Sequence, residues 1–340
     1  MFALGPSERS SGAVARPLRE RADCAAYAAM GYWFYRWDWG EGIAFEGLDA
    51  WSRVSRQPLF ADYVTATLDG WIASTSGKPS RFGPAICLLA EGRVDERYLE
   101  FARRVGDVLL AAPMEGGAVL LDAPSRSIFV DTLCSDPPFL LRLAQVTGDE
   151  RYAQRARDIV LGHCRLLQNT DSGLFSHFVD TGSGVAPGIA WGRGNGWAAL
   201  GLANYLADCP KDAPERAEVE QRFTLFCEGL ERHRIAHAGW RNLIDREESY
   251  PESSSTVLIS AALTMAAASG WLPAGWRQIA DETWKAVEHR IDTSGHLVGV
   301  SYRPGVNTDP SRYEHAPALG GGYPWAQGPY LLAAAQRYTA

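Results

Sequence analysis

A glycine-rich segment at residues 190–197 is the densest chemical signal in the sequence. It reads Ala-Trp-Gly-Arg-Gly-Asn-Gly-Trp and precedes an apolar helical run. Its glycines let the backbone approach a ligand closely, and the free N–H groups that open the following helix favour an anion. Arg193 suits a carboxylate, and Trp191 and Trp197 offer faces for stacking. The spacing is not that of a phosphate-binding loop. The segment therefore predicts a ligand site, with a glycine-rich turn packed on core tryptophans as the alternative.

Two titratable residues upstream are candidates for the same site. His177 ends the segment Gly-Leu-Phe-Ser-His shortly before the glycine-rich loop. Asp131 follows the apolar run Ile-Phe-Val, and an acid among apolar neighbours is a candidate for a raised pKa and for general-acid catalysis near neutral pH. The structural alternatives are a hydrogen-bonded core histidine for His177 and a helix N-cap for Asp131. Asp136, which precedes two prolines, is predicted to be an N-cap.

The composition excludes several classes of protein. With 46% hydrophobic and 21% charged residues, the chain of 340 residues is not intrinsically disordered. Its net charge of −7 argues against nucleic acid or an anionic membrane as a partner. The 12 tryptophans suit stacking on sugars or bases, although a large core also explains them. His233 and His237 have the spacing of a helical metal pair, but no third ligand accompanies them, so we expect a solvated helix face and no metal.

The six cysteines form no close pair, which favours reduced thiols and a cytoplasmic location. Residues 1–20 are expected to be a mobile leader, and they lack the features of a secretory signal. The longest apolar stretch, Val257–Leu272, is too short and too interrupted to span a membrane. We expect residues 21–340 to form one domain, because no linker interrupts them.

An internal repeat predicts the architecture that positions these residues. Asp-Glu-Arg-Tyr at 95–98 recurs at 149–152, and each copy opens an amphipathic helix with acidic residues. A period near 50 residues indicates stacked helical hairpins. About twelve helices in six hairpins would close into an all-α (α/α)6 barrel, with an open solenoid as the competing architecture. Besides the two repeat helices, the expected helices are 22–36, 41–52, 58–74, 83–91, 138–146, 197–208, 215–233, 254–269, 276–290 and 325–338. Strand patterns are confined to 117–122, 173–179 and 296–302.

Several segments occur in an order that resembles one family across residues 35–335. They are Trp39–Ala44, Phe129–Leu133, Thr147–Tyr152, Gly173–His177, Trp191–Trp197 and Glu252–Thr256. In this order they resemble the unsaturated uronyl hydrolases of glycoside hydrolase families 88 and 105, and Arg-Gly-Asn-Gly-Trp is the most specific part.

The resemblance implies a six-hairpin (α/α)6 barrel that acts on the small oligosaccharides left by polysaccharide lyases. Such products carry a C4=C5 double bond in a terminal uronic acid, which the family hydrates without a metal, a nucleotide or any other cofactor. Asp131 matches the family's general acid/base. The resemblance also implies a set of substrate-binding positions: Trp39, His177, Trp191, Arg193, Asn195 and Trp197.

One departure from the family pattern concerns a second aspartate. The family carries it in the loop before the helix that precedes the first Asp-Glu-Arg-Tyr, whereas residues 76–84 contain no acid here. Arg81 in this loop is a candidate to grip the uronate carboxylate instead. Three functions follow as alternatives: hydration of an unsaturated uronide, a different barrel reaction (hydrolysis of a saturated uronide or sugar epimerisation), and non-catalytic carbohydrate binding.

Overall fold

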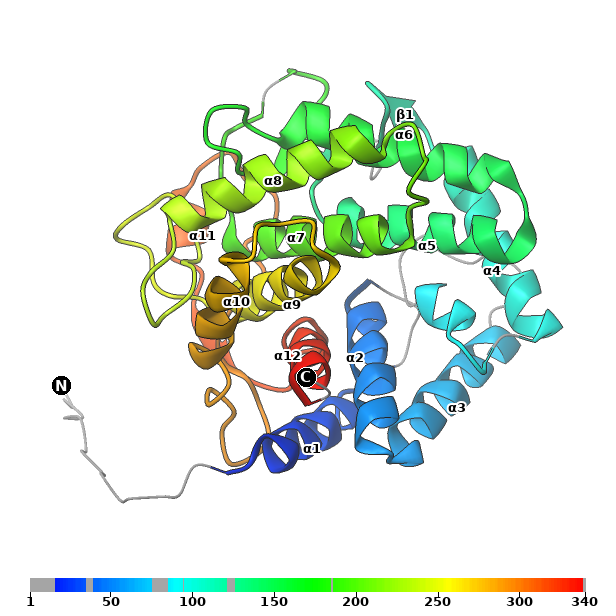
Figure 1. Cartoon of the computed structure of the whole chain (residues 1–340), viewed down its shortest axis with the longest axis horizontal. Helices are drawn as coiled ribbons and strands as arrows, with labels where there is room; N and C mark the ends of the chain where they lie inside the picture. The colour runs from blue at the N-terminus through cyan, green and yellow to red at the C-terminus, as the bar shows by residue number, and fades with distance from the viewer. Residues whose placement is uncertain are drawn as a thin grey trace.

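The computed structural model describes residues 16–34, 39–74, 85–93, 95–120, 126–184 and 186–338. Within these ranges the secondary structure is mostly helical (Figure 1). The helices are α1 (Leu18–Met30), α2 (Trp39–Ser55), α3 (Pro58–Ser74), η1 (Ala85–Leu89, a 3₁₀ helix), α4 (Glu96–Ala111), α5 (Thr132–Thr147), α6 (Glu150–Leu167), α7 (Gly192–Asp208), α8 (Arg216–Arg232), α9 (Ser253–Ser269), α10 (Trp276–Lys285), α11 (Ser311–Glu314) and α12 (Pro324–Tyr338). Short strands form three antiparallel pairs: β1 (Met114–Glu115) with β2 (Ala118–Val119), β3 (Ser127–Phe129) with β4 (Phe178–Asp180), and β5 (Val298–Ser301) with β6 (Ala318–Gly320).

The inner helices form a closed ring. Going around it, α2 contacts α12, α12 contacts α9, α9 contacts α7, α7 contacts α5, and η1 joins α5 back to α2. An outer helix packs on each inner member: α1 on α12, α3 on α2, α4 on η1, α6 on α5, α8 on α7 and α10 on α9. Figure 1 shows both layers, with α8 outside α7 and α3 outside α2. The (α/α)6 barrel is confirmed, and the open solenoid is excluded because α12 returns to α2.

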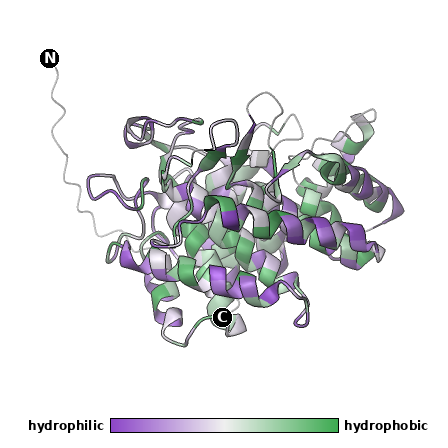
Figure 2. Ribbon diagram, turned by 90° about the horizontal axis from the view of Figure 1, so that it is seen from above, coloured by the Kyte–Doolittle hydropathy of each residue, from purple (hydrophilic) through white to green (hydrophobic). Residues whose placement is uncertain are grey.

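The helices of the two layers differ in how much of their surface is apolar, because the outer helices are buried on one face and the inner helices on nearly all sides. The outer helices α4 and α6 bury one face, while α7 and α9 in the inner ring are buried nearly all round. Figure 2 shows apolar residues gathered toward the middle of the barrel and polar ones on the outer helices and loops.

Glycines allow the inner helices to approach each other closely. A Cβ on Gly201 of α7 would lie 2.2 Å from the carbonyl oxygen of Leu133 on α5. A Cβ on Gly47 of α2 would lie 2.4 Å from the carbonyl oxygen of Gly328 on α12. Side chains at these positions would push the neighbouring inner helices apart.

The helix positions agree well with expectation, and the differences have local causes. Asp95 and Asp149 cap α4 and α6 by accepting hydrogen bonds from the backbone N–H groups of Tyr98 and Arg151. The segment expected as a helix at 83–91 is the short η1, and α11 was not expected. The helix that was expected at 22–36 begins at Leu18, directly after Pro17, inside the segment predicted to be a leader. Residues 1–15 lie outside the described residues.

Two predicted helix-end features were wrong. Asp136 is not an N-cap, because α5 already begins at Thr132 and carries Pro137 and Pro138 in its interior. His233 and His237 do not share a helix face, because α8 ends at Arg232 and His237 has a positive φ of 61°.

Candidate active site

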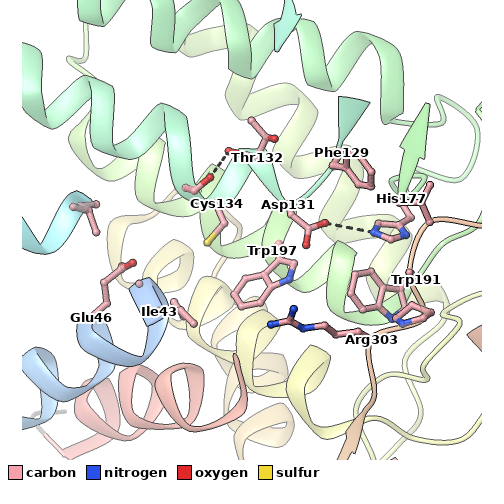
Figure 3. Close-up of a pocket in the computed structure, with 16 residues that line it drawn as sticks. Ile43, Glu46, Phe129, Asp131, Thr132, Cys134, His177, Trp191, Trp197 and Arg303 are labelled. Atoms are coloured by element: carbon pink, nitrogen blue, oxygen red, sulfur yellow. Dashed lines mark hydrogen bonds and ion pairs between the residues drawn. The ribbon is translucent and has the colours of Figure 1, made fainter. Parts of the chain in front are cut away.

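The N-terminal ends of several inner helices surround a partly open cavity of about 240 Å³ (Figure 3). The segment after β3 brings in Asp131, the segment before β4 brings in His177, and the start of α7 adds Trp191 and Trp197. The loop after β5 contributes Arg303. Further lining comes from Gly42, Ile43, Glu46, Ile86, Phe129, Thr132, Cys134, Ser135, Pro304, Gly305 and Val306. Chain segments far apart in sequence therefore converge on one acid and several aromatic rings.

Asp131 lies at this cavity, and its side chain does not cap the helix that follows it. The antiparallel pair of β3 and β4 sets its position, and the Val130 N–H donates to the carbonyl oxygen of His177 at 3.0 Å. Asp131 occupies the cap position of α5 but makes no capping hydrogen bond, and its Oδ2 has no hydrogen-bond partner among the described residues. Burial raises the pKa of Asp131 to about 6, against the opposing effects of Arg193 and Arg303. A carboxyl group with these properties can act as a general acid.

His177 is a neutral imidazole that faces Asp131. Its Nε2 lies 3.6 Å from Asp131 Oδ2 (Figure 3), and burial, helped by Arg193, lowers the pKa of His177 to about 3. The hydroxyl of Tyr313 lies 2.7 Å from His177 Nδ1. Burial raises the pKa of Tyr313 to about 12, while the Asn307 N–H donates to the same hydroxyl. A neutral hydroxyl at this distance can donate to Nδ1, which favours the tautomer with the imidazole proton on Nε2, on the side of Asp131.

The aromatic walls occupy their predicted places. The side chains of Trp191 and Trp197 are buried in the protein and line the cavity. The rings of Trp191 and His177 are 4.5 Å apart between centroids, and the Arg193 guanidinium carbon lies 4.5 Å from the Trp191 ring. Trp191 is thus fixed between a neutral ring on one side and a cation on the other.

Arg193 does not line the cavity, contrary to the expectation that it would contact the ligand. Its side chain is 0% exposed, and its Nη1 donates to the carbonyl and hydroxyl oxygens of Ser301, each at 2.8 Å. Glu252 Oε1, which also caps α9, lies 3.9 Å away. This network engages Nη1, while Nε and Nη2 have no hydrogen-bond partner among the described residues. In this structure Arg193 acts on the site through its charge and its contact with Trp191.

Asn195 is also a structural residue in this arrangement. Its Oδ1 accepts from the Phe175 N–H at 2.9 Å, and its Nδ2 donates to the carbonyl oxygens of Phe175 and Trp191 at 2.9 and 3.0 Å. The amide is fully buried and fastens the segment before His177 to the start of α7. Two other predicted residues cannot be placed, because Arg81 and the side chain of Trp39 lie outside the described residues.

Sequence reasoning missed three residues of the site. Arg303 lines the cavity from the loop after β5, with its guanidinium carbon 4.6 Å from the Trp325 ring. Tyr313 lies behind His177, and Glu46 lines the cavity from α2. Glu46 had a detectable signal, since it is an acid three residues after Ile43 on a largely buried helix. Arg303 and Tyr313 had none, because a long segment separates them from the residues they approach.

The match to a family model covers nearly the whole chain. Residues 25–340 match the model described as Glycosyl Hydrolase Family 88. The chain belongs to this glycoside hydrolase family. An unsaturated rhamnogalacturonyl hydrolase, YesR, from Bacillus subtilis (strain 168) is 26% identical over 296 residues, which cover 83% of this chain and 84% of that protein. The resemblance seen in the sequence is confirmed.

Solved structures share the barrel of this family 88 member. A possible member of the GH105 family from Klebsiella pneumoniae subsp. pneumoniae MGH 78578 superposes with a TM-score of 0.87 at 16% identity, over 100% of this chain and 99% of that one. The unsaturated glucuronyl hydrolase from Bacillus sp. GL1 superposes with a TM-score of 0.70 at 16% identity, over 93% and 96%. At these identities the likeness establishes the fold.

Membrane-spanning helices and metal-binding clusters are both absent from the described residues. No helix there is long and apolar enough to cross a membrane. No group of three or more His, Cys, Asp or Glu side chains in the same part of the chain is arranged to hold a metal ion.

Proposed function

We propose that this glycoside hydrolase releases an unsaturated uronic acid from small lyase-generated oligosaccharides by hydrating the C4=C5 double bond. The observation that carries the proposal is Asp131, an acid of raised pKa that lines a cavity walled by tryptophans and whose Oδ2 accepts no hydrogen bond from the described residues. The related rhamnogalacturonyl hydrolase supports this substrate class. Hydration needs only one acid that later acts as a base, and Asp131 can fill both roles.

In the proposed reaction, Asp131 passes one proton forward and takes one back. The protonated carboxyl donates to C4, the electron pair of the double bond forms the new C4–H bond, and positive charge develops at C5 and the ring oxygen. Water adds to C5 and loses a proton to the Asp131 carboxylate, which regenerates the acid. The resulting hemiketal opens at its C5–oxygen bond, and the group at C1 then leaves as the next sugar. The net change is consumption of one water molecule and cleavage of the glycosidic bond.

The neighbours of Asp131 fit this sequence of steps. The neutral His177 presents an N–H toward the carboxyl without the full positive charge that would lower the pKa of Asp131. Trp191 and Trp197 provide apolar faces for the sugar ring and exclude bulk water. We assign the contact with the substrate carboxylate to Arg303, which is exposed at the cavity, in place of the buried Arg193.

We also propose that the enzyme works in the cytoplasm. All six cysteines are free, and four of them are buried. Unpaired thiols suit a reducing compartment. Fractionation of the native host, with detection of the protein by antibody, tests this assignment, and recovery outside the cytoplasm would contradict it.

The decisive experiment incubates the wild-type protein and Asp131→Asn with lyase-generated unsaturated disaccharides. Loss of the ultraviolet absorbance of the double bond is expected for the wild type, and a fall in rate of about 10³-fold or more for the variant, because Asn cannot donate the proton.

Since the acid must be protonated, wild-type kcat/KM should decrease as pH rises above about 6. Release of a saturated uronate would instead indicate ordinary hydrolysis, and binding without turnover would indicate a carbohydrate-binding barrel.

The stability of the same variant separates lost chemistry from lost folding. The folded-state pKa of Asp131 is raised above the unfolded value, so folding is penalised as pH rises from about 4 to about 6 and remains penalised above that. Asn removes the penalty, so Asp131→Asn should be more stable than the wild type at pH 7, by on the order of 1–3 kcal/mol. If Asp131→Asn does not fold, its loss of activity says nothing about the role of Asp131. The activity of Asp131→Ser then provides the second test.

A further inference from the structure

A second carboxyl group faces the catalytic cavity from α2. Glu46 lines the cavity together with Ile43, one turn earlier on the same helix. Figure 3 shows both at the end of the cavity away from His177 and Trp191. Glu46 and Ile86 also line a second cavity of about 390 Å³, whose lining includes Arg53 and Arg142. The Glu46 carboxyl group therefore lies where two cavities meet.

Among the described residues, no hydrogen bond or salt bridge explains the carboxyl group of Glu46, and Arg142 provides only a longer-range attraction. The nearby cation Arg142 donates to Asp208 Oδ2 at 2.6 Å, and the nearby Asp49 accepts two hydrogen bonds from Arg93 at 2.6 and 2.8 Å. No described residue forms a hydrogen bond or salt bridge with Glu46 itself. Enclosing a carboxyl group without a partner costs free energy. Such a group is characteristic of a site where a ligand supplies the missing partner.

We propose that Glu46 is a substrate-binding residue, whose carboxyl group hydrogen-bonds to an acidic oligosaccharide at the end of the cavity opposite His177. The inference deepens the proposed function and rests on it, because the ligand is taken to be an anionic sugar. It also supplies an acid on the cavity wall of a chain whose loop at residues 76–84 contains none.

The ionisation of Glu46 makes the proposal testable. Burial raises the pKa of Glu46 to about 7, with Asp49 adding to the increase and Arg142 opposing it. Below this pH the group is a neutral hydrogen-bond donor, and above it an anion that repels the substrate carboxylate. The charged and titratable groups around it are Asp49, Arg53, Cys87, Glu91, Arg93, Asp131, Cys134, Arg142 and Arg303.

The test measures binding of an unsaturated disaccharide by calorimetry in the Asp131→Asn background, where turnover is expected to be about 10³-fold slower or more and residue 131 does not titrate. From about pH 6 to about pH 8.5, we expect Kd of this variant to rise about tenfold or more as Glu46 ionises. Adding Glu46→Gln, which keeps the size and a hydrogen-bond donor, should make Kd nearly independent of pH and give tighter binding at the alkaline end.

Glu91→Gln in the same background is the matched control. Glu91 lines the second cavity but not the catalytic one, so this variant should keep the pH dependence. The inference would be overturned if Kd of Asp131→Asn did not change with pH. It would also be overturned if Kd of the double variant with Glu46→Gln rose with pH to the same extent. In either case the proposed function stands if the wild type still turns over the disaccharide. Absence of both turnover and binding would overturn the two together.

Discussion

At the scale of single residues, the site depends on a histidine that does not carry a charge. A protonated imidazole 3.6 Å from Asp131 would stabilise the carboxylate and lower the pKa of the acid. Burial keeps His177 neutral, and the Tyr313 hydroxyl at 2.7 Å favours the tautomer with the proton on Nε2. The lowered pKa of His177 and the raised pKa of Asp131 are thus two parts of one arrangement.

Removing the Tyr313 hydroxyl should therefore impair catalysis more than folding. Tyr313→Phe keeps the ring but leaves His177 Nδ1 without its donor, so the tautomer that faces Asp131 is no longer fixed. We expect kcat/KM to fall about 10–100-fold with a small change in Tm, measured by steady-state kinetics and thermal unfolding. Tyr27→Phe, on the exposed face of α1, is the control and should behave as wild type. Unchanged kinetics in Tyr313→Phe would contradict the assigned proton position.

How far the site could be predicted depends on what each residue contacts. Asp131 became a candidate because it follows an apolar run, and His177 because it lies shortly before the glycine-rich loop; the β3–β4 pair brings the two together. Arg193 was placed in the right region, but its interaction with Ser301 could not be foreseen across 108 residues of sequence. Arg303 reaches the cavity from a loop with no distinctive composition. Local patterns mark the chemistry of a residue, whereas tertiary packing decides which surface it faces.

At the scale of elements, the barrel depends on backbone contact between neighbouring inner helices. Arg193 and Glu252 link the start of α7 to the cap of α9, and Ser301 on β5 joins both through its backbone. The sequence predicted these helices well because repeats and helix caps are local signals. The inner helices α7 and α9 show weaker periodicity because they are buried nearly all round.

A methyl group at Gly201 should test the contact between α7 and α5. A Cβ there would lie 2.2 Å from the backbone oxygen of Leu133, which cannot move without shifting α5. We expect Gly201→Ala to lower the free energy of unfolding by about 3 kcal/mol, measured by denaturant titration. Gly70→Ala in α3, where no atom lies within 4 Å of the added Cβ, should be neutral or stabilising by up to about 1 kcal/mol. Equal effects at the two positions would argue against close packing as the cause.

At the scale of the whole molecule, α12 joins the end of the chain to its beginning. Gln327 on this helix accepts from the Leu297 N–H at 2.8 Å and donates to the carbonyl oxygens of Ala25 at 3.1 Å and Gly295 at 2.7 Å. The side chain is fully buried, so it connects α1, α12 and the turn before β5 away from water. One amide thereby satisfies three backbone groups.

Gln327→Leu should be strongly destabilising, because all three backbone groups lose their partner inside the protein. We expect a loss of about 2–5 kcal/mol, seen as a lower Tm, with little change in the kinetics of the fraction that remains folded. Gln145→Leu removes an amide hydrogen bond at an exposed position and should change stability by less than about 1 kcal/mol. A Gln327→Leu protein as stable as the wild type would show that water replaces the amide.

The closure of the ring by its last helix has a consequence for synthesis of the protein on the ribosome. The faces of α2 and α9 that contact α12 have no partner until residues 324–338 leave the ribosomal exit tunnel. The five preceding hairpins can form in order as they emerge, but they remain an open arc with two unfinished edges. Final closure therefore waits until these residues have emerged. Until then the nascent enzyme exposes the faces of α2 and α9 that will contact α12, and a molecular chaperone would have to cover both.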